Sequence, residues 1–342
     1  MPTIAADELR TLTRAIFEGA GTPADLAETV ADHLINANLA GHDSHGVIRI
    51  PSYVGAIQRK ALDPTARPSV LNDKGPTVLV DGNWAFGQVA ARYAIDLAVS
   101  RARELGVALV GIVRCNHIGR VGEYPTIAAQ RGVAAFVTVG SASGRSVAPF
   151  GGRAGALGTN PISFGFPAAG HPPFLVDFAT SAIAGGKVMV ARAKGEEVPP
   201  GSLIDANGEP TRDPNAYFDG GALLPFGGHK GYGLSMMVSL FAGVLTQPGA
   251  HSSEGHGASG CLMVAIDAGA FGPAERTVAD ADAAIDRIKA IPPAAGFDEV
   301  LVPGEPEARS RERRLREGIP VPERTWAEIQ ATAESLGVRT RA

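Results

Sequence analysis

The fourteen residues Val-Ala-Leu-Val-Gly-Ile-Val-Arg-Cys-Asn-His-Ile-Gly-Arg, from Val107 to Arg120, begin as an apolar run and end as a polar one. The nearly unbroken, β-branched run 107–113 is typical of a strand buried on both faces. A second such run follows at 132–139, and helical patterns at 88–105 and 121–130 flank the two. This alternation predicts an α/β layer architecture.

The polar residues after the first run form a candidate site. Open α/β sheets bind ligands beyond the ends of their strands, which is where Asn116 and His117 fall. His117 is therefore a candidate acid or base, and a histidine that only anchors a loop is the equally open alternative. Cys115 and His117 also suggest a metal, with His42 or His45 as further ligands. No ligand set of the usual spacing appears, so we expect no metal.

A second polar stretch, Gly-His-Asp-Ser-His-Gly-Val-Ile-Arg-Ile-Pro, spans residues 41–51. His45 and Arg49 are four apart, a spacing that places them on one face of either a helix or a strand. A guanidinium binds a carboxylate with two hydrogen bonds, and an imidazole can exchange a proton with a neighbouring oxygen. The pair therefore suits a 2-oxo or 2-hydroxy acid. The alternative is structural: His42 and Asp43 cap a helix, His45 is a buried structural residue and Arg49 pairs with a surface acid.

Outward from these stretches, the first 62 residues are expected to be largely helical. Helical spacing covers 7–18 and about 24–40, with Thr22 as the expected N-cap, and Gly41 is a natural helix stop. Further strands are expected at Val70–Leu71, Thr77–Val80, Ile162–Phe166, Phe174–Phe178 and Cys261–Ile266. Further helices are expected at 183–194, 230–245, 278–291 and 326–336. The arginine-rich segment 309–316 is expected to be a solvated helical face.

Composition narrows the class of protein. The 342 residues carry a formal net charge of -4, with 45% apolar and 19% charged residues, as in a packed globular chain. The sequence contains no strongly basic domain, so we do not expect the protein to bind nucleic acid. Two cysteines fit a reducing compartment, and neither a signal peptide nor a membrane span is evident. We therefore expect a cytoplasmic protein.

Two glycine-rich stretches and one carboxylate lie near the expected strands and helix starts. Residues 146–161 lead into a strand, Asp177 ends the next strand, and 227–233 open a helix whose N-terminus and Lys230 would attract a phosphate. Residues 255–260 match G-x-G-x-x-G, but they precede a strand instead of following one. They are therefore interpreted as a strand-entry loop, and a conventional Rossmann fingerprint is lacking.

Seven motifs, in order along the chain, resemble the malate/L-lactate dehydrogenase family of the second type. They are DSHGVIRIPSY (43–53), CNHIGRVGEY (115–124), VAPFGG (147–152) with GTNPISF (158–164), VDFATSAIAGGKV (176–188), DANGEPTRDP (205–214), LLPFGGHKGYGLS (223–235) and PGEPE (303–307). The resemblance implies a non-Rossmann, mixed-sheet NAD(P)-binding α/β domain flanked by helices. It also implies a helical domain built from both chain ends, and a homodimer. We place the helical domain at 1–65 and 281–342, and the α/β domain at 66–280.

The resemblance also implies roles for residues. His45 is similar to the family's general acid/base, with Ser44 beside it and Arg49 on the substrate carboxylate. Asp177 would orient or charge His45, and His117 falls where some members have a proton acceptor. NAD or NADP would contact Ser141, Thr159, Asn160, Asp177, Phe178, Ala179, Thr180, Lys230, Gly304 and Glu305.

The sequence therefore predicts an enzyme that transfers hydride between nicotinamide and C2 of a small 2-hydroxy or 2-oxo acid resembling malate, lactate or sulfolactate. The alternative substrate is a cyclic 2-imino acid such as piperideine- or pyrroline-2-carboxylate. A metal-dependent lyase and a catalytically idle binding protein also stay open. Two departures from the family pattern, residues 141–146 and Arg120, lie near the expected site and leave the substrate and the choice of cofactor open.

Overall fold

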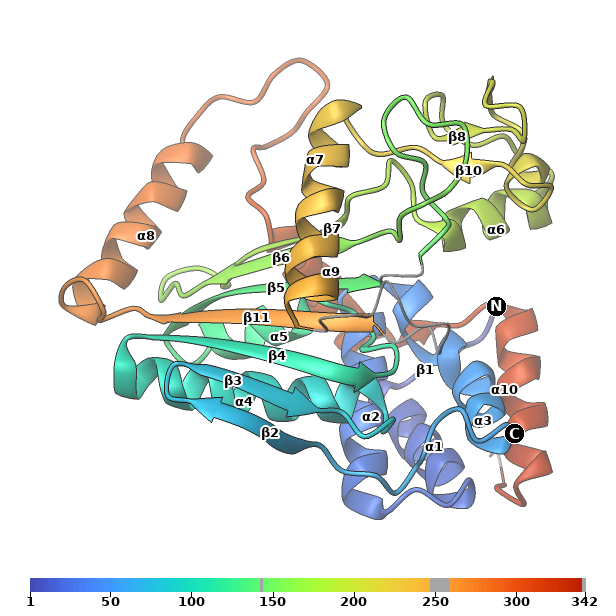
Figure 1. Ribbon diagram of the computed structural model, residues 1–342, viewed down its shortest axis with the longest axis horizontal. Coiled ribbons are helices and arrows are strands. Elements are labelled where there is room, and N and C mark those ends of the chain that lie inside the picture. The colour runs from blue at the N-terminus through green and yellow to red at the C-terminus, as the bar shows by residue number, and fades with distance from the viewer. Residues whose placement is uncertain (142–143, 247–258, 340–342) are drawn as a thin grey trace.

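The computed structural model describes residues 1–141, 144–246 and 259–339. A mixed seven-stranded sheet runs through its centre (Figure 1). In spatial order its strands are β2 (Ser69–Lys74), β3 (Thr77–Asp81), β4 (Val107–Cys115), β11 (Ser259–Asp267), β5 (Val133–Ser141), β6 (Pro161–Phe166) and β7 (Phe174–Ala179). β3 and β4 pair in parallel, and the other neighbours are antiparallel. The mixed α/β prediction is confirmed.

Helices cover both faces of this sheet. On one face α4 (Gly87–Leu105) and α5 (Glu123–Ala129) bury an alanine- and valine-rich core against β4, β11 and β5. On the other, α7 (His229–Val238) continues as a π-helical segment, η4 (Ser239–Leu245), and packs on β5, β6 and β11. α8 (Ala274–Lys289) stands apart from α7 on that same side (Figure 1). It is continuous across the expected domain boundary at 280/281.

A second core is built from both chain ends. α1 (Ala6–Gly19), α2 (Ala24–Leu39), α3 (Ile50–Gln58) and α10 (Glu323–Ser335) share one buried apolar cluster. β1 (Thr3–Ile4) pairs with β12 (Ile319–Pro320), so that the N-terminal strand lies beside the segment before α10 (Figure 1). The helix expected after Thr22 begins at Ala24 with Pro23 as its N-cap, and no described side chain caps it.

A small lobe sits above the sheet beside α7 (Figure 1). It contains α6 (Gly185–Lys194), the 3-10 turn η3 (Pro214–Tyr217) and a sheet of β8 (Leu203–Ile204), β9 (Pro210–Thr211) and β10 (Ala222–Leu223). These two-residue strands lie in the segment expected to be loops, and are too short to leave a periodic pattern. Of the expected strand-entry loop, residues 255–258 fall outside the described residues.

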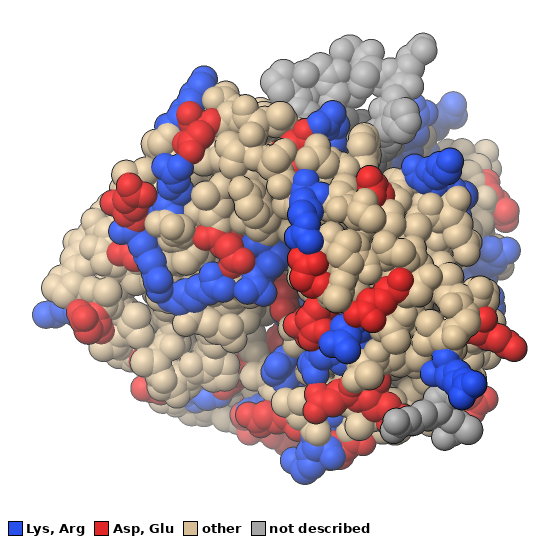
Figure 2. Space-filling model, turned by 90° about the horizontal axis from the view of Figure 1, so that it is seen from below, with Lys and Arg blue, Asp and Glu red and all other residues tan. Residues whose placement is uncertain are grey.

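Side chains of α9 (Glu305–Glu317) fasten this helix to α2 and to the turn after it. Arg314 was expected on a solvated face, but its side chain is only 12% exposed and forms an ion pair with Asp43. Arg311 donates to Asn36 of α2. The arginine run therefore includes anchoring residues, because helical periodicity turns part of it towards α2. Elsewhere acidic and basic side chains are mixed on the surface (Figure 2).

Candidate active site

A cleft of about 730 Å³ lies where the helical cluster meets the ends of β4 and β7 and the start of α6. Its lining brings together residues far apart in the sequence. Among the predicted site residues, the lining includes Ser44, His45, Arg49, His117, Thr159, Asn160, Asp177, Phe178 and Ala179. Ile118, Val121, Val139 and Ile183 add apolar surface. An apolar cleft with a few convergent polar groups is typical of a small-molecule site.

The turn that carries Ser44, His45 and Arg49 is folded against the end of α2. Gly41, at φ +86°, ends that helix, and two 3-10 turns follow, η1 (Asp43–His45) and η2 (Val47–Arg49). Asn38 holds both turns: its amide donates to Asp43, and its Oδ1 accepts from the backbone N–H of Val47. A Cβ at position 46 would lie 2.1 Å from Asn38 Oδ1, so only glycine fits there.

Arg49 keeps an uncompensated positive charge in the cleft. Its Nε donates to the carbonyl of Ser44 at 2.7 Å, which fixes the side chain against its own turn. Within the described residues no carboxylate comes within ion-pair distance of Arg49. A half-buried guanidinium without an acidic partner can accept an anionic ligand.

His45 lies beside Arg49 as a neutral imidazole. Ser44 Oγ is 2.9 Å from His45 Nδ1, and the rings of His45 and His117 stack with centroids 5.5 Å apart. Burial, aided by the charge of Arg49, lowers the pKa of His45 to about 4. At neutral pH His45 is therefore ready to accept a proton, as a general base does.

Two buried side chains, one on α3 and one on α4, hold the ring of His117 in place. Tyr53 Oη lies 2.7 Å from His117 Nδ1, and the amide of Gln88 donates to the same oxygen, also at 2.7 Å. Burial lowers the pKa of His117 to about 3, with smaller contributions from Arg49, His45 and His33. Tyr53 lies four residues after Arg49, and this spacing could have identified Tyr53 as a residue on the same face as Arg49. No sequence pattern links Gln88 to His117.

Asp177 lies in the cleft, but its described hydrogen bond is not to His45, the partner that the resemblance implies. Its Oδ2 accepts from the backbone N–H of Gly122 at 2.9 Å and lies 3.6 Å from Arg120 Nε, whereas the ring nitrogen of His45 faces Ser44. Burial raises the pKa of Asp177, and the guanidinium of Arg120 opposes that rise. Arg120, one of the departures from the family pattern, is itself buried between Asp177 and Glu123.

The other expected cofactor residues differ in position. Thr180 is buried next to the cleft and donates to Thr159, and Asn160 is held by Ser235 and Ser239 of the α7–η4 helix. Lys230 is exposed on α7, outside the cleft lining. Ser141 ends β5, and its side chain lies outside the described residues.

Gly304 and Glu305 also lie outside the cleft lining, at the start of α9. Gly304 has φ +100°, and Glu305 pairs with Lys289. Within the described part of the chain, no three His, Cys, Asp or Glu side chains come together as a metal site. No described helix is long and apolar enough to cross a membrane.

Comparison with known proteins identifies the relatives of this chain. The family model described as malate/L-lactate dehydrogenase matches residues 4–330. Hydroxycarboxylate dehydrogenase B of Escherichia coli strain K12 is 38% identical, over 97% of this chain and 94% of its own. A Delta(1)-pyrroline-2-carboxylate/Delta(1)-piperideine-2-carboxylate reductase of Pseudomonas putida is 38% identical, over 96% of each chain. The solved sulfolactate dehydrogenase of Methanocaldococcus jannaschii superposes with a TM-score of 0.90 at 30% identity, covering 98% of both chains.

Fold, cleft and relatives together define an oxidoreductase. The chain belongs to the malate/L-lactate dehydrogenase family, over nearly its whole length. The resemblance seen in the seven sequence motifs is thereby confirmed.

Proposed function

We propose that the protein is an NAD(P)-dependent dehydrogenase that transfers hydride between nicotinamide and C2 of a small 2-hydroxy or 2-oxo acid. The observation that carries this proposal is the pairing of an uncompensated Arg49 with a neutral His45 in one cleft. Arg49 would bind the substrate carboxylate with two parallel hydrogen bonds. His45 would take the hydroxyl proton during oxidation, while the C2 hydrogen leaves as hydride and the C=O bond forms.

The cleft supports binding of a nicotinamide. Thr159, Asn160, Phe178 and Ala179 line the same cleft as the two histidines. At Gly158 a Cβ would lie 2.8 Å from Asn160 Oδ1, so glycine lets the backbone of this cleft-lining residue pack against Asn160. When bound, the cofactor supplies the hydride acceptor or donor, and the protein supplies orientation and proton transfer. Whether the cofactor is NAD or NADP is decided by assaying both.

A cyclic 2-imino acid is the second candidate substrate, because one of the relatives is named a pyrroline- and piperideine-2-carboxylate reductase. Such a substrate also carries a carboxylate for Arg49. His45 would then exchange its proton with the ring nitrogen, and Asp177 would add negative charge nearby. Activity on cyclic imines without activity on 2-oxo acids would favour this candidate.

The test of the proposed function is substitution at Arg49. Positioning should account for much of the rate, so we expect Arg49→Ala to lose at least about 100-fold in kcat/KM, with kcat falling as well as KM rising. Arg49→Lys, which keeps the charge without the bidentate fork, should recover part of the loss. A change within about threefold for Arg49→Ala would remove the carboxylate-binding role. Near-normal turnover in His45→Ala would likewise remove His45 as the proton carrier.

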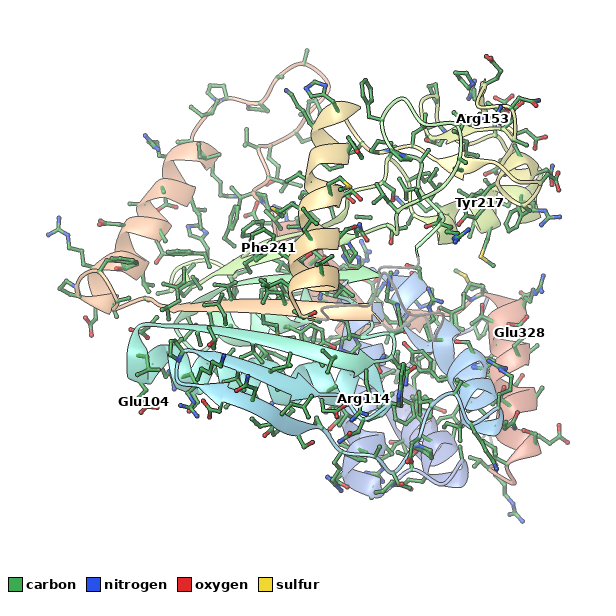
Figure 3. All side chains as sticks on the ribbon, in the orientation of Figure 1. Glu104, Arg114, Arg153, Tyr217, Phe241 and Glu328 are labelled. Carbon is green, nitrogen blue, oxygen red and sulfur yellow. The ribbon has the colours of Figure 1, made fainter. Side chains whose placement is uncertain are left out.

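We further propose a homodimer. An open groove lies over the sheet beside α8, and all of its lining side chains are apolar, among them Phe136, Phe164 and Ile288. The neighbouring η4 segment exposes Leu240, Phe241 and Leu245. Figure 3 shows Phe241 on this helix above the sheet. Exposed apolar surface of this kind is typical of a surface buried in an assembly.

A further inference from the structure

A buried hydrogen-bonded chain runs from α4 through α3 to the catalytic cleft. Gln88 Nε2 donates to Tyr53 Oη, and Tyr53 Oη lies at the same distance, 2.7 Å, from His117 Nδ1. Gln88 is 1% exposed and Tyr53 is 7% exposed, so water does not compete for these groups. Neither residue belongs to the set expected from the sequence to act in the site.

The direction of this chain follows from the donors available. A phenol has one proton, and an amide nitrogen has only donors. Since Tyr53 Oη already accepts from Gln88, its own proton is free to be donated to His117 Nδ1. Among the described residues Tyr53 Oη has no other acceptor for its proton, so this direction leaves no buried hydroxyl unsatisfied. Neutral His117 then carries its proton on Nε2, the other ring nitrogen.

The reverse orientation of the Gln88 amide is less favourable. In the observed orientation Oε1 has no hydrogen-bond partner among the residues that the structure describes. Exchanging the two groups would put the NH₂, with two donors, in that same place. Unpaired buried N–H groups are rarer in proteins than under-satisfied carbonyl oxygens. The observed polarity is thus the one that leaves fewer unsatisfied groups.

We propose that Gln88 and Tyr53 are positioning residues that fix His117 as a neutral Nε2–H donor in the cleft. His117 would donate a hydrogen bond to the substrate oxygen while His45 carries the proton. The proposal rests on the proposed function for the identity of that oxygen. The two stacked imidazoles would then have different roles. His117 would stabilise the negative charge that develops on the substrate oxygen, and His45 would exchange the proton.

The backbone around His117 supports such a fixed donor. Gly87, the residue before Gln88, is packed so closely that a Cβ would lie 2.4 Å from the carbonyl oxygen of His117. The amide of Asn116 donates to the carbonyls of Trp84 and Ala85, just before α4. The start of α4 and the residues just before it therefore contact both backbone and side-chain atoms of the loop that carries His117.

The direct test is nitrogen NMR of the full chain labelled with ¹⁵N-histidine, with His117 assigned from the resonances lost in His117→Gln. We expect His117 to be protonated on Nε2 and bare on Nδ1 at neutral pH. A proton on Nδ1 would overturn the proposal. This readout needs no turnover, so it stands or falls separately from the proposed function.

Gln88→Glu tests the relay with nearly unchanged shape. When ionised, the introduced carboxylate can only accept, so Tyr53 would turn its proton to it and could only accept from His117. As pH rises through the pKa of that carboxyl, His117 should move its proton to Nδ1, and kcat/KM should fall about tenfold or more. The charged or titratable neighbours acting on His117 are Arg49, His45 and His33, and they are unchanged in this variant.

Gln88→Met is the matched control, because it fills a similar volume and cannot ionise. We expect its loss of activity to have the pH dependence of the wild type. Parallel pH profiles for Gln88→Glu and Gln88→Met would show that the amide only fills space, and would overturn the proposal. If Gln88→Glu does not fold, Tyr53→Phe replaces it: removing the donor to Nδ1 should abolish the Nε2–H preference in the spectrum, and an unchanged tautomer would contradict the relay.

Discussion

His45 is the residue whose environment most directly constrains the pH dependence of the enzyme. Its pKa is lowered to about 4, so the imidazole is neutral throughout the neutral range. Oxidation of a hydroxy acid needs this neutral form. We expect kcat/KM for oxidation to stay flat from about pH 8 to pH 6 and to fall only as the pH approaches 4. An acidic limb with a midpoint near 6.5, the value of an ordinary histidine, would contradict this environment.

At this scale the sequence located much of the candidate site. The four-residue spacing of His45 and Arg49, and the polar end of the 107–113 strand, predict groups that the structure brings into one cleft. The hydrogen bonds of Tyr53 to His117 and of Gln88 to Tyr53 were not predictable, because they join residues 64 and 35 positions apart in the sequence. The partner expected for Asp177 differed because Arg120 and Gly122 meet its carboxylate first.

At the scale of elements, α9 supports the turn that carries Ser44, His45 and Arg49 through the partly buried side chain of Arg314. Arg314 donates to both carboxylate oxygens of Asp43 and to the carbonyl of Asn38. Removing it leaves Asp43 without its cation and Asn38 with a less constrained carbonyl. We expect Arg314→Ala to cost about 1–3 kcal/mol of unfolding free energy and to reduce kcat/KM by about tenfold.

Arg316→Ala is the control for that prediction, because Arg316 is exposed and forms a surface ion pair with its neighbour Glu317. Its effect should stay within about 0.5 kcal/mol, since exposed pairs contribute little. Chemical denaturation gives both free energies. Equal effects of the two substitutions would show that Arg314 does not anchor the turn.

Periodicity predicted most elements of the sheet and helices, with ends shifted by a few residues. The 107–113 run continues to Cys115, and the 230–245 helix changes to π-helical geometry at Ser239. The strand order was not predictable from local patterns. β11 inserts between β4 and β5, strands that come more than a hundred residues earlier, and only packing across the whole chain decides that pairing.

For the whole molecule, buried histidines should make stability depend on pH. Burial lowers the pKa of His33 to about 3; its Nε2 accepts from the backbone N–H of Arg120. The unfolded state therefore binds more protons than the folded state between about pH 3 and 6.5, and stability is lost as pH falls through that range. The raised pKa values of Asp177 and Glu123 act in the opposite direction.

His33→Gln isolates the histidine contribution. The wild type should lose about 2 kcal/mol more than this variant between pH 7 and pH 5, from linkage at a single group. Urea denaturation at the two pH values measures the difference. An equal loss in both proteins would mean that His33 titrates alike in the folded and unfolded chains.

The proposed dimer is also a property of the whole molecule. Phe241→Glu places a charge on the exposed apolar face, and we expect light scattering to show a shift from dimer to monomer. Phe271→Glu is the control, because Phe271 is 95% exposed in the connection before α8. A wild-type monomer at micromolar concentration, or a dimer unaffected by Phe241→Glu, would contradict the assignment of this face.

The most direct test of the central claim is a reductase screen that follows absorbance at 340 nm, with NADH and NADPH each in turn. The substrates are pyruvate, oxaloacetate, sulfopyruvate, piperideine-2-carboxylate and pyrroline-2-carboxylate. We predict cofactor oxidation with at least one of these carboxylates, and its loss in Arg49→Ala. Silence across the panel, together with no change in NADH fluorescence on mixing with the protein, would contradict the assignment of the cleft as a nicotinamide-dependent active site.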